Sequence, residues 1–477
     1  MVAFSIDPAS KEAESFPRPF LMCVGSCHAG TALREDWRRQ MEKCRRDIGF
    51  TFVRFHGLLD DDMSVCREEV GRIVYSFHNV DSIFDFLLGI GMKPFVELSW
   101  MPGCIASGTR SAFHYRGNVT PPKDYSLWRD LVRTLTRHLV DRYGSREVSA
   151  WYFEVWNEPN LEYFWTGSQE EYFRLYREAA RAVKEMDGGI PVGGPATARN
   201  EWITDMISFC EREGVPLDFI STHSYPTDIA LDEERGNRRV VALRRGILAS
   251  MARTAREQAG KYPLHYTEWN SSPSSRDPMH DEPFAAAFIV KTAVDTAPFV
   301  QSYSYWTFSD IFEELGFPSL PFHGGFGLLT IHGVPKPSYR AFQLLRMLGS
   351  ERLPVRSDSP QSMLECVATR GEGAVMLLLY NHNAAGLPLE RERARIDVRG
   401  LTRASEITLY RIDKDHANAA KSWKAMWSPE YPDANVLSKL IEASEMRPES
   451  LRGTEVGGVV RVEIEVPAHG VVGVRIR

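Results

Sequence analysis

The sequence lacks the features that direct a chain into or across a membrane. Residues 1–20, MVAFSIDPASKEAESFPRPF, are polar and are interrupted by Pro17 and Pro19, where a secretory signal needs an apolar core. Nowhere do eighteen apolar residues follow one another. The chain has only seven cysteines in 477 residues, at scattered positions, which suits reduced thiols better than a disulfide framework. We therefore expect a cytoplasmic protein that is neither secreted nor membrane-spanning.

An excess of positive charge is missing too. Lys and Arg number 57 against 63 Asp and Glu, which leaves no basic face for a nucleic acid. The sequence has no complete G-x-G-x-x-G, no Walker loop and no G-x-S-x-G motif. Cys23, Cys27 and His28 do not have the spacing of a zinc site, and no second pair of ligands follows. We expect no nucleic-acid partner, no metal and no organic cofactor, so carboxylates become the candidate chemistry.

Short apolar runs alternate with longer amphipathic segments over most of the chain, which predicts strands alternating with helices. Eight such pairs fit a closed (β/α)8 TIM barrel better than an open, doubly wound sheet. The predicted strands are 20–25, 52–55, 93–98, 151–156, 190–194, 218–223, 263–268 and 302–307. The predicted helices are 37–48, 79–90, 124–142, 169–186, 200–213, 238–259, 283–296 and 337–348.

The pattern changes near residue 352. Segments such as AVMLLLYNHN, ARIDVRG, EITLYRID and VVRVEIEV alternate apolar and polar residues, and a helical period returns only near 435–445. This predicts a separate antiparallel β-sandwich over residues 351–477. The catalytic barrel is then expected over residues 20–350, and the N-terminal segment 1–19 is expected to pack on the β domain.

Two glutamates are expected at the mouth of this barrel, where the strands end and barrel enzymes carry their active sites. The fourth strand, WYFEVW, is followed by Asn157 and Glu158, and the seventh strand ends at Glu268. A glutamate beside Pro159 is by itself often only a helix cap or a solvated loop residue. Two carboxylates facing each other across the mouth, however, suit cleavage of a glycosidic bond, in which one holds a proton and the other is ionised.

These motifs resemble those of glycoside hydrolase family 39, which contains β-xylosidases and α-L-iduronidases within clan A of the retaining glycosidases. The resemblance rests on an ordered set of segments: VRFHG, WNEPN, THSYP, TEWN, YWTFSD, FEELG and FHGGFGL. It extends from about residue 20 to the end, because YRIDKDHANA also resembles the C-terminal domain of that family. The FEE and FHGGFGL segments favour the xylosidase branch.

The resemblance implies a role for each glutamate and for several neighbours. Glu158 would be the general acid/base, and Glu268 would be the nucleophile. Asn157 would bind the 2-hydroxyl of the sugar. Arg54 would lie under the nucleophile and keep it ionised, and His56 would contact a sugar hydroxyl.

Further residues are implied around this centre. His223 and Tyr225 would orient the two carboxylates. Glu314, together with Glu313, would bind hydroxyls at the far side of the sugar, and the sequence does not decide which of the two has the larger role. Two more side chains would close the wall of the pocket: His114 and Trp306.

The expected activity is that of a retaining β-D-xylosidase, which releases xylose from the non-reducing end of xylo-oligosaccharides. One alternative is an α-L-iduronidase-like enzyme or another clan A exo-glycosidase, with arabinosidase activity as an example. Another is a non-catalytic sugar-binding protein on the same barrel, which the presence of both Glu158 and Glu268 disfavours. The resemblance leaves the formation of a homo-oligomer open.

Overall fold

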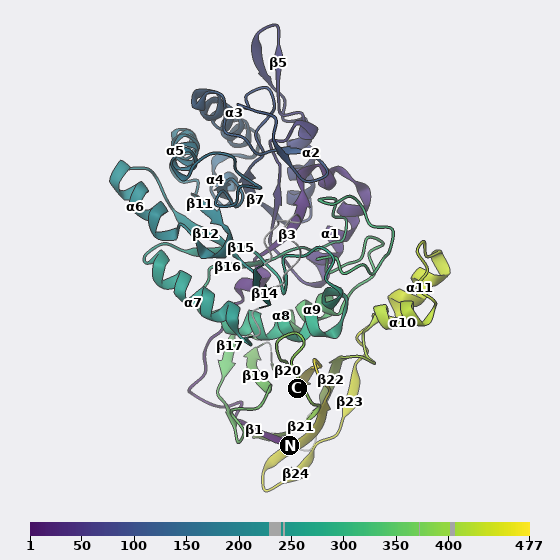
Figure 1. Ribbon diagram of the computed structural model, residues 1–477. Coiled ribbons are helices and arrows are strands. Elements are labelled where there is room, and N and C mark those ends of the chain that lie inside the picture. The colour runs from purple at the N-terminus through teal and green to yellow at the C-terminus, as the bar shows by residue number, and fades with distance from the viewer. Residues whose placement is uncertain (229–239, 242–243, 372, 401–405) are drawn as a thin grey trace.

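The computed structural model describes residues 1–228, 240–241, 244–371, 373–400 and 406–477 (Figure 1). Eight parallel strands close into a barrel, each hydrogen-bonded to the next along the chain, with the last beside the first. This confirms the predicted TIM barrel. The barrel strands are β3 (Cys23–His28), β4 (Phe52–His56), β7 (Lys93–Leu98), β10 (Tyr152–Val155), β11 (Val192–Thr197), β12 (Phe219–Ser224), β15 (Leu264–Trp269) and β16 (Ser302–Tyr305).

Helices surround the barrel, and each buries its apolar face. Trp37, Met41 and Cys44 of the first helix are fully buried, as their helical spacing predicts. The helices are α1 (Glu35–Asp47), α2 (His78–Gly89), α3 (Tyr125–Tyr143), α4 (Ser145–Val148), α5 (Gln169–Met186), α6 (Ile203–Glu213), α7 (Ile247–Ala259), α8 (Pro283–Thr296) and α9 (Pro337–Met347). Single 3-10 turns add η1 (Pro19–Leu21), η2 (Ala29–Leu33), η3 (Asp61–Met63), η4 (Ala198–Asn200) and η6 (Pro278–Asp281).

The helix predicted over 238–259 was wrong in its first part. It begins only at Ile247, directly after Gly246, whose positive φ of 74° breaks the helical path. Residues 240–241 form the short strand β14 (Val240–Val241), which pairs with β13 (Thr227–Asp228). Positions 238–239 and 242–243 of the prediction lie outside the described residues.

Short hairpins and one long loop are inserted between the strands and helices of the barrel. Strands β5 (Cys66–Glu69) and β6 (Arg72–Tyr75) form a hairpin that projects away from the rest of the molecule (Figure 1). A smaller hairpin joins β8 (Ser111–Ala112) to β9 (Gly117–Asn118). The segment between β16 and α9 contains no regular strand or helix and carries the FEELG and FHGGFGL motifs. The long loop supplies Glu314 to the site described below, and the β8–β9 hairpin is hydrogen-bonded to it there.

The C-terminal part forms two sheets with a common apolar core. The first has the order β18-β1-β21-β25-β24, and the second has the order β2-β17-β19-β20-β26-β22-β23. Strand β1, from the N-terminus, runs parallel to β21 and antiparallel to β18. The strands are β1 (Val2–Ile6), β2 (Glu14–Ser15), β17 (Glu351–Leu353), β18 (Val355–Ser357), β19 (Leu364–Gly371), β20 (Ala374–Asn381), β21 (Glu392–Arg399), β22 (Ile407–Ile412), β23 (Glu449–Leu451), β24 (Thr454–Val456), β25 (Val459–Val466) and β26 (Val471–Ile476).

Two helices extend from one side of the sandwich (Figure 1). Helix α11 (Ala434–Ala443) matches the helical period near 435–445, whereas α10 (Ala419–Ala425) was not predicted. Together they form a small apolar cluster in which Trp423 and Leu440 pack with Phe322 and Val334 of the long loop after β16. Among all the helices that the structure describes, none has the length and apolar character needed to cross a membrane.

Candidate active site

Glu158 lies just beyond the end of β10, where the backbone turns sharply. Trp156 and Glu158 both adopt positive φ values, 73° and 42°, which non-glycine residues rarely do. The turn is held by the Glu158 N–H, which donates to the carbonyl of Ala196 in β11 at 2.9 Å. Backbone strain of this kind is concentrated at functional sites. The turn places the Glu158 side chain inside the mouth of the barrel instead of leaving it in solvent.

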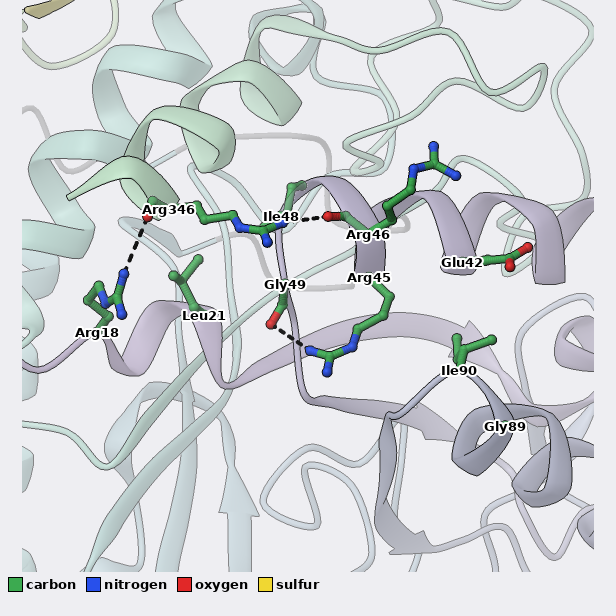
Figure 2. Close-up of a pocket in the computed structure, with 10 residues that line it drawn as sticks. All are labelled: Arg18, Leu21, Glu42, Arg45, Arg46, Ile48, Gly49, Gly89, Ile90 and Arg346. Atoms are coloured by element: carbon green, nitrogen blue, oxygen red, sulfur yellow. Dashed lines mark hydrogen bonds between the residues drawn. The ribbon is translucent and has the colours of Figure 1, made fainter. Parts of the chain in front are cut away.

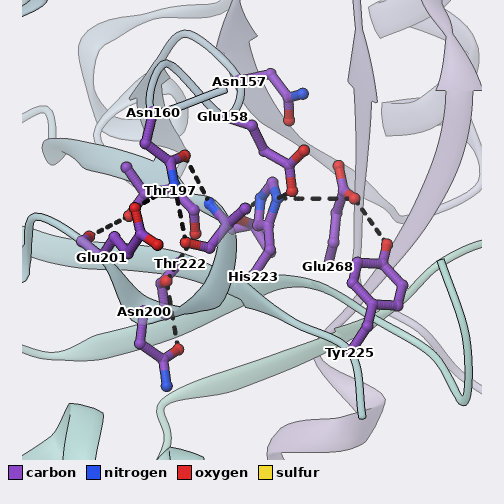
Figure 3. A network of polar contacts seen from close by, with 12 residues as sticks. Asn157, Glu158, Asn160, Thr197, Asn200, Glu201, Thr222, His223, Tyr225 and Glu268 are labelled. Carbon is purple, nitrogen blue, oxygen red and sulfur yellow. Dashed lines mark hydrogen bonds and ion pairs between the residues drawn. The ribbon is translucent and has the colours of Figure 1, made fainter. Parts of the chain in front are cut away.

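Glu268 reaches the same space from β15, and His223 from β12 lies between the two carboxylates (Figure 3). One oxygen of each glutamate and one ring nitrogen of His223 all lie within 4.8 Å of one another. All three residues are buried. The structure therefore brings the two predicted catalytic carboxylates together, from the fourth and seventh barrel strands.

The two glutamates have different surroundings. Glu268 receives hydrogen bonds from Arg54 Nη1 at 2.7 Å and from the Tyr225 hydroxyl at 2.9 Å. Burial raises the pKa of Glu268, but the Arg54 cation opposes that rise. Burial also raises the pKa of Glu158, to well above its usual range, and the negative charge of Glu268 adds to the effect. This environment favours an ionised Glu268 next to a protonated Glu158.

Arg54 is the centre of the polar network beneath these carboxylates. Its guanidinium is fully buried and contacts Glu154 Oε2 at 2.6 Å, Glu97 Oε2 at 2.8 Å and the Asn157 amide oxygen at 3.0 Å. Glu97 lies in β7 and Glu154 lies in β10. Neither Glu97 nor Glu154 was assigned a role from the sequence. A carboxylate within an otherwise apolar barrel strand does, however, indicate a buried charge that needs a partner. Burial raises the pKa of Glu97 to about 7.

His56 joins this network to the far side of the site. Its Nδ1 lies 2.9 Å from Glu97 Oε2, and its Nε2 lies 3.5 Å from Glu268 Oε1 and 3.9 Å from Glu314 Oε1. Burial lowers the pKa of His56 to about 3, so the ring is neutral at ordinary pH. The indole of Trp306 packs against it, with ring centroids 4.7 Å apart. Glu314 and Trp306 therefore both lie at the site, as expected.

Glu313 points away from the catalytic pair. Its carboxylate contacts Nε2 of His28, and this histidine stacks on Tyr115 with a centroid separation of 3.9 Å. The hydrogen bond from His28 holds the pKa of Glu313 below its usual value. Of the two adjacent glutamates, only Glu314 faces the catalytic pair. The spacing of His28 from Cys23 and Cys27 argues against a zinc ligand, and no motif in the sequence indicates its contact with Glu313.

His114 contributes to the wall through its backbone. Its N–H donates to the Glu314 carbonyl at 2.8 Å, which links the β8–β9 hairpin to the loop after β16. The imidazole of His114 is exposed. The sequence predicts that this side chain closes the pocket, whereas in the structure the residue makes a backbone contact beside Glu314.

The cluster of Glu158, His223 and Glu268 could also hold a metal ion, because its ligand atoms are close enough together. The Arg54 guanidinium, at 2.7 Å from Glu268, disfavours a second cation there. The chemistry that this arrangement supports best is proton transfer by Glu158 and nucleophilic attack by Glu268.

A wide hollow of about 620 Å³ lies elsewhere, near the N-terminal ends of the barrel strands (Figure 2). Its arginines are used in capping: Arg45 donates to the Gly49 carbonyl at 3.0 Å, and Arg18 donates to the Leu348 carbonyl at 3.0 Å. Cationic side chains commonly satisfy the free carbonyls at the C-termini of helices in this way. We interpret this hollow as structural, because barrel enzymes react at the opposite end.

Comparison with known proteins agrees with this geometry. The family model for glycosyl hydrolases family 39 matches residues 3–461. A beta-xylosidase of Caldicellulosiruptor saccharolyticus is 51% identical over 460 residues, which cover 95% of this chain and 94% of the relative. A beta-xylosidase of Geobacillus stearothermophilus is 35% identical and covers 96% and 92%. The crystal structure of a monomeric beta-xylosidase from Caulobacter crescentus CB15 superposes with a TM-score of 0.90 at 32% identity, covering 100% and 99%.

Proposed function

Because this chain belongs to glycosyl hydrolases family 39, we propose that it is a retaining β-D-xylosidase acting on the non-reducing ends of short xylo-oligosaccharides. The observation that carries the proposal is the buried pair of Glu158 and Glu268, whose surroundings favour opposite protonation states. The choice of xylose rests on the two full-length relatives that are beta-xylosidases.

The reaction proceeds by double displacement. Glu268 attacks the anomeric carbon while Glu158 donates its proton to the departing oxygen, and a covalent glycosyl-enzyme forms. Glu158, now ionised, then takes a proton from water, which attacks the same carbon and releases Glu268. Retaining enzymes hold the two carboxyl groups about 5 to 5.5 Å apart, and inverting enzymes need about 6.5 to 9.5 Å. The spacing of at most 4.8 Å between carboxylate oxygens supports retention.

The neighbours of this pair support recognition of a neutral pentose. Arg54 holds the amide oxygen of Asn157, so the NH2 group of that amide is free to turn toward the 2-hydroxyl of the sugar. Glu314 accepts hydrogen bonds from hydroxyls on the far side. An iduronide would bring a further carboxylate next to Glu314 and the ionised Glu268, where Arg54 already faces several acidic groups, and burying another negative charge there is costly. We therefore prefer a xylosidase to an iduronidase.

We also propose a cytoplasmic location, supported by seven cysteines that are all free thiols. The only partner that the proposed activity requires is a small oligosaccharide, and a net charge of −6 does not favour nucleic acid.

Turnover of chromogenic β-xyloside, α-iduronide and α-arabinoside by the purified chain tests the substrate. We expect hydrolysis of the xyloside and no hydrolysis of the iduronide, with Glu268→Gln as the inactive control. Efficient iduronide cleavage would overturn the assignment, and binding of xylose without any turnover would favour the sugar-binding alternative. Proton NMR of the first sugar released tests the mechanism: β-xylose is expected, and an initial α-anomer would exclude double displacement.

A further inference from the structure

A row of buried side chains connects the polar network around Arg54 to the catalytic acid. His223 Nδ1 lies 2.9 Å from Glu158 Oε1, and its Nε2 lies 3.0 Å from Thr267 Oγ1. The same Thr267 hydroxyl lies 2.8 Å from Glu154 Oε1. Thr267 directly precedes the nucleophile in β15, at a register shift in the pairing of β15 with β12.

The hydrogen atoms in this row can be assigned from its chemistry. Burial raises the pKa of Glu154, but Arg54 Nε, which donates to Glu154 Oε2 at 2.6 Å, opposes that rise and favours the ionised form, and an ionised carboxylate can only accept. Thr267 has one hydroxyl hydrogen and must therefore donate it to Glu154. The Thr267 oxygen then accepts from His223, so the imidazole hydrogen is on Nε2.

The other ring nitrogen of His223 is consequently without a hydrogen. Burial lowers the pKa of His223 well below its usual value, so the ring is neutral and carries a single N–H. The lone pair of Nδ1 faces Glu158 Oε1. A contact of 2.9 Å between a lone pair and a carboxyl oxygen is favourable only when the proton is on Glu158.

We propose that Thr267 and Glu154 are positioning residues that fix His223 in its Nε2–H tautomer and thereby hold the proton on Glu158 until a glycosidic oxygen takes it. This inference rests on the proposed function and deepens it. The same tautomer also assists the second step of the reaction, in which water attacks the glycosyl-enzyme. After Glu158 loses its proton, the Nδ1 lone pair destabilises the carboxylate and favours removal of a proton from water.

Other charged groups also influence the protonation of Glu158 and His223, so the substitution used as a test must not change their charges. The titratable and charged side chains that influence Glu158 or His223 are Arg54, His56, Glu97, Arg199, Tyr225, Glu268 and Glu314. Replacing Thr267 alters none of these charges, because a threonine hydroxyl does not titrate in this range.

The test compares Thr267→Val, which keeps the shape and removes the hydroxyl, with Thr267→Ser, which keeps the hydroxyl. In the valine variant His223 is free to place its hydrogen on Nδ1 and donate it to an ionised Glu158, which lowers the pKa of that acid. The protonated fraction at neutral pH then falls. We expect the basic limb of the pH profile of kcat/KM on xylobiose to move about one pH unit lower. At a pH above that limb, kcat/KM of the valine variant should then be about tenfold lower than that of the wild type.

Leaving groups distinguish this role from a general disturbance of the site. A dinitrophenyl xyloside needs little acid assistance, so its kcat/KM should be nearly unchanged in Thr267→Val, while Thr267→Ser should resemble the wild type on both substrates. Equal losses on both substrates at every pH, or an unmoved basic limb, would overturn the proposal. If the unmodified chain does not cleave xylosides at all, it is the proposed function that fails.

Nitrogen-15 NMR of histidine-labelled wild-type protein provides a measurement that needs no active variant. The His223 ring should show a protonated Nε2 and an unprotonated Nδ1, and its signals can be assigned by their loss in His223→Gln. A protonated Nδ1 in the resting enzyme would overturn the inference.

Discussion

Four buried glutamates and the partly buried Glu314 gather around a buried arginine at the mouth and upper interior of the barrel, and their roles differ because their contacts differ. Arg54 contacts Glu97, Glu154 and Glu268 directly. Glu158 and Glu314 are not among the ion pairs of that guanidinium, and burial raises both of their pKa values. One cation cannot neutralise all of these carboxylates, so some must stay protonated. The distribution of contacts selects Glu158 as an acid and Glu268 as an anion.

Azide should identify the role of each catalytic glutamate. In Glu268→Gly the nucleophile is absent, so we expect turnover to be abolished and added azide to yield the α-glycosyl azide. In Glu158→Ala the first step should remain fast on substrates with good leaving groups, and azide should then yield the β-azide. Product stereochemistry by NMR checks both results, and the reverse pattern would exchange the two assignments.

The adjacent glutamates Glu313 and Glu314 form a matched pair for testing specificity. Glu314 faces the catalytic carboxylates, so Glu314→Gln should lower kcat/KM on xyloside by at least about tenfold, which corresponds to one lost hydrogen bond to the sugar. Glu313 faces His28, and a glutamine there can still accept a hydrogen bond from that ring. Steady-state kinetics should therefore show a clearly smaller effect for Glu313→Gln. Equal effects would argue against a sugar contact by Glu314.

Sequence motifs indicated the site residues that lie at the ends of barrel strands, such as Glu158 and Glu268. The C-terminal ends of the strands meet at one mouth in every barrel of this type, so no further detail of the structure is needed to place them together. The motifs did not reveal Glu97, Glu154 or Thr267. Each of these acts through a neighbour from another strand, and the pairing of strands distant in sequence is not visible in a local pattern. The different directions of Glu313 and Glu314 could not be predicted either, because they depend on a contact with His28 at the end of β3.

At the scale of elements, predictions were accurate where the sequence carries its own start signal. Helix α5 begins as predicted because Ser168 and Glu171 form a capping box. Helix α8 also begins as predicted, at Pro283, which is favourable in the first turn. Helix α7 has no side-chain hydrogen bond at its N-terminus, and its apolar period alone suggested too early a start.

Lys336 anchors the long loop that carries Glu314. Its ammonium is fully buried and contacts Asp281 at 2.7 Å and Asp310 at 2.6 Å, and the same aspartates accept from the N–H groups of Gly324 and Gly327. Lys336→Met leaves two buried carboxylates without their cation, so we expect a loss of about 3 to 5 kcal/mol in the free energy of unfolding. Chemical denaturation measures it.

A surface lysine serves as the control for that measurement. Lys261 pairs with Glu211 in solvent, so Lys261→Met should leave the denaturation midpoint almost unchanged. A similar midpoint for Lys336→Met and the wild type would show that the buried cluster does not anchor the loop.

At the scale of the whole molecule, the first strand of the chain completes the last domain. Val2, Phe4 and Ile6 of β1 are buried in the core of the sandwich, between strands from the other end of the sequence. Phe4 is only 2% exposed, so Phe4→Ala should reduce the free energy of unfolding by about 3 to 5 kcal/mol. The same change at Phe317, which is 40% exposed, should have little effect. Thermal denaturation of the two variants tests the difference.

The position of β1 also has a consequence for protein synthesis. Strand β1 leaves the ribosome before the other strands that the structure describes, whereas its parallel partner β21 begins only at Glu392. At about 5 to 20 residues per second, the apolar face of β1 must wait roughly 20 to 80 s for that partner. The barrel strands are all translated in this interval, so the barrel can close before the sandwich does. A ribosome that stalls between the two domains would therefore carry a folded barrel while the apolar face of β1 is still exposed to water.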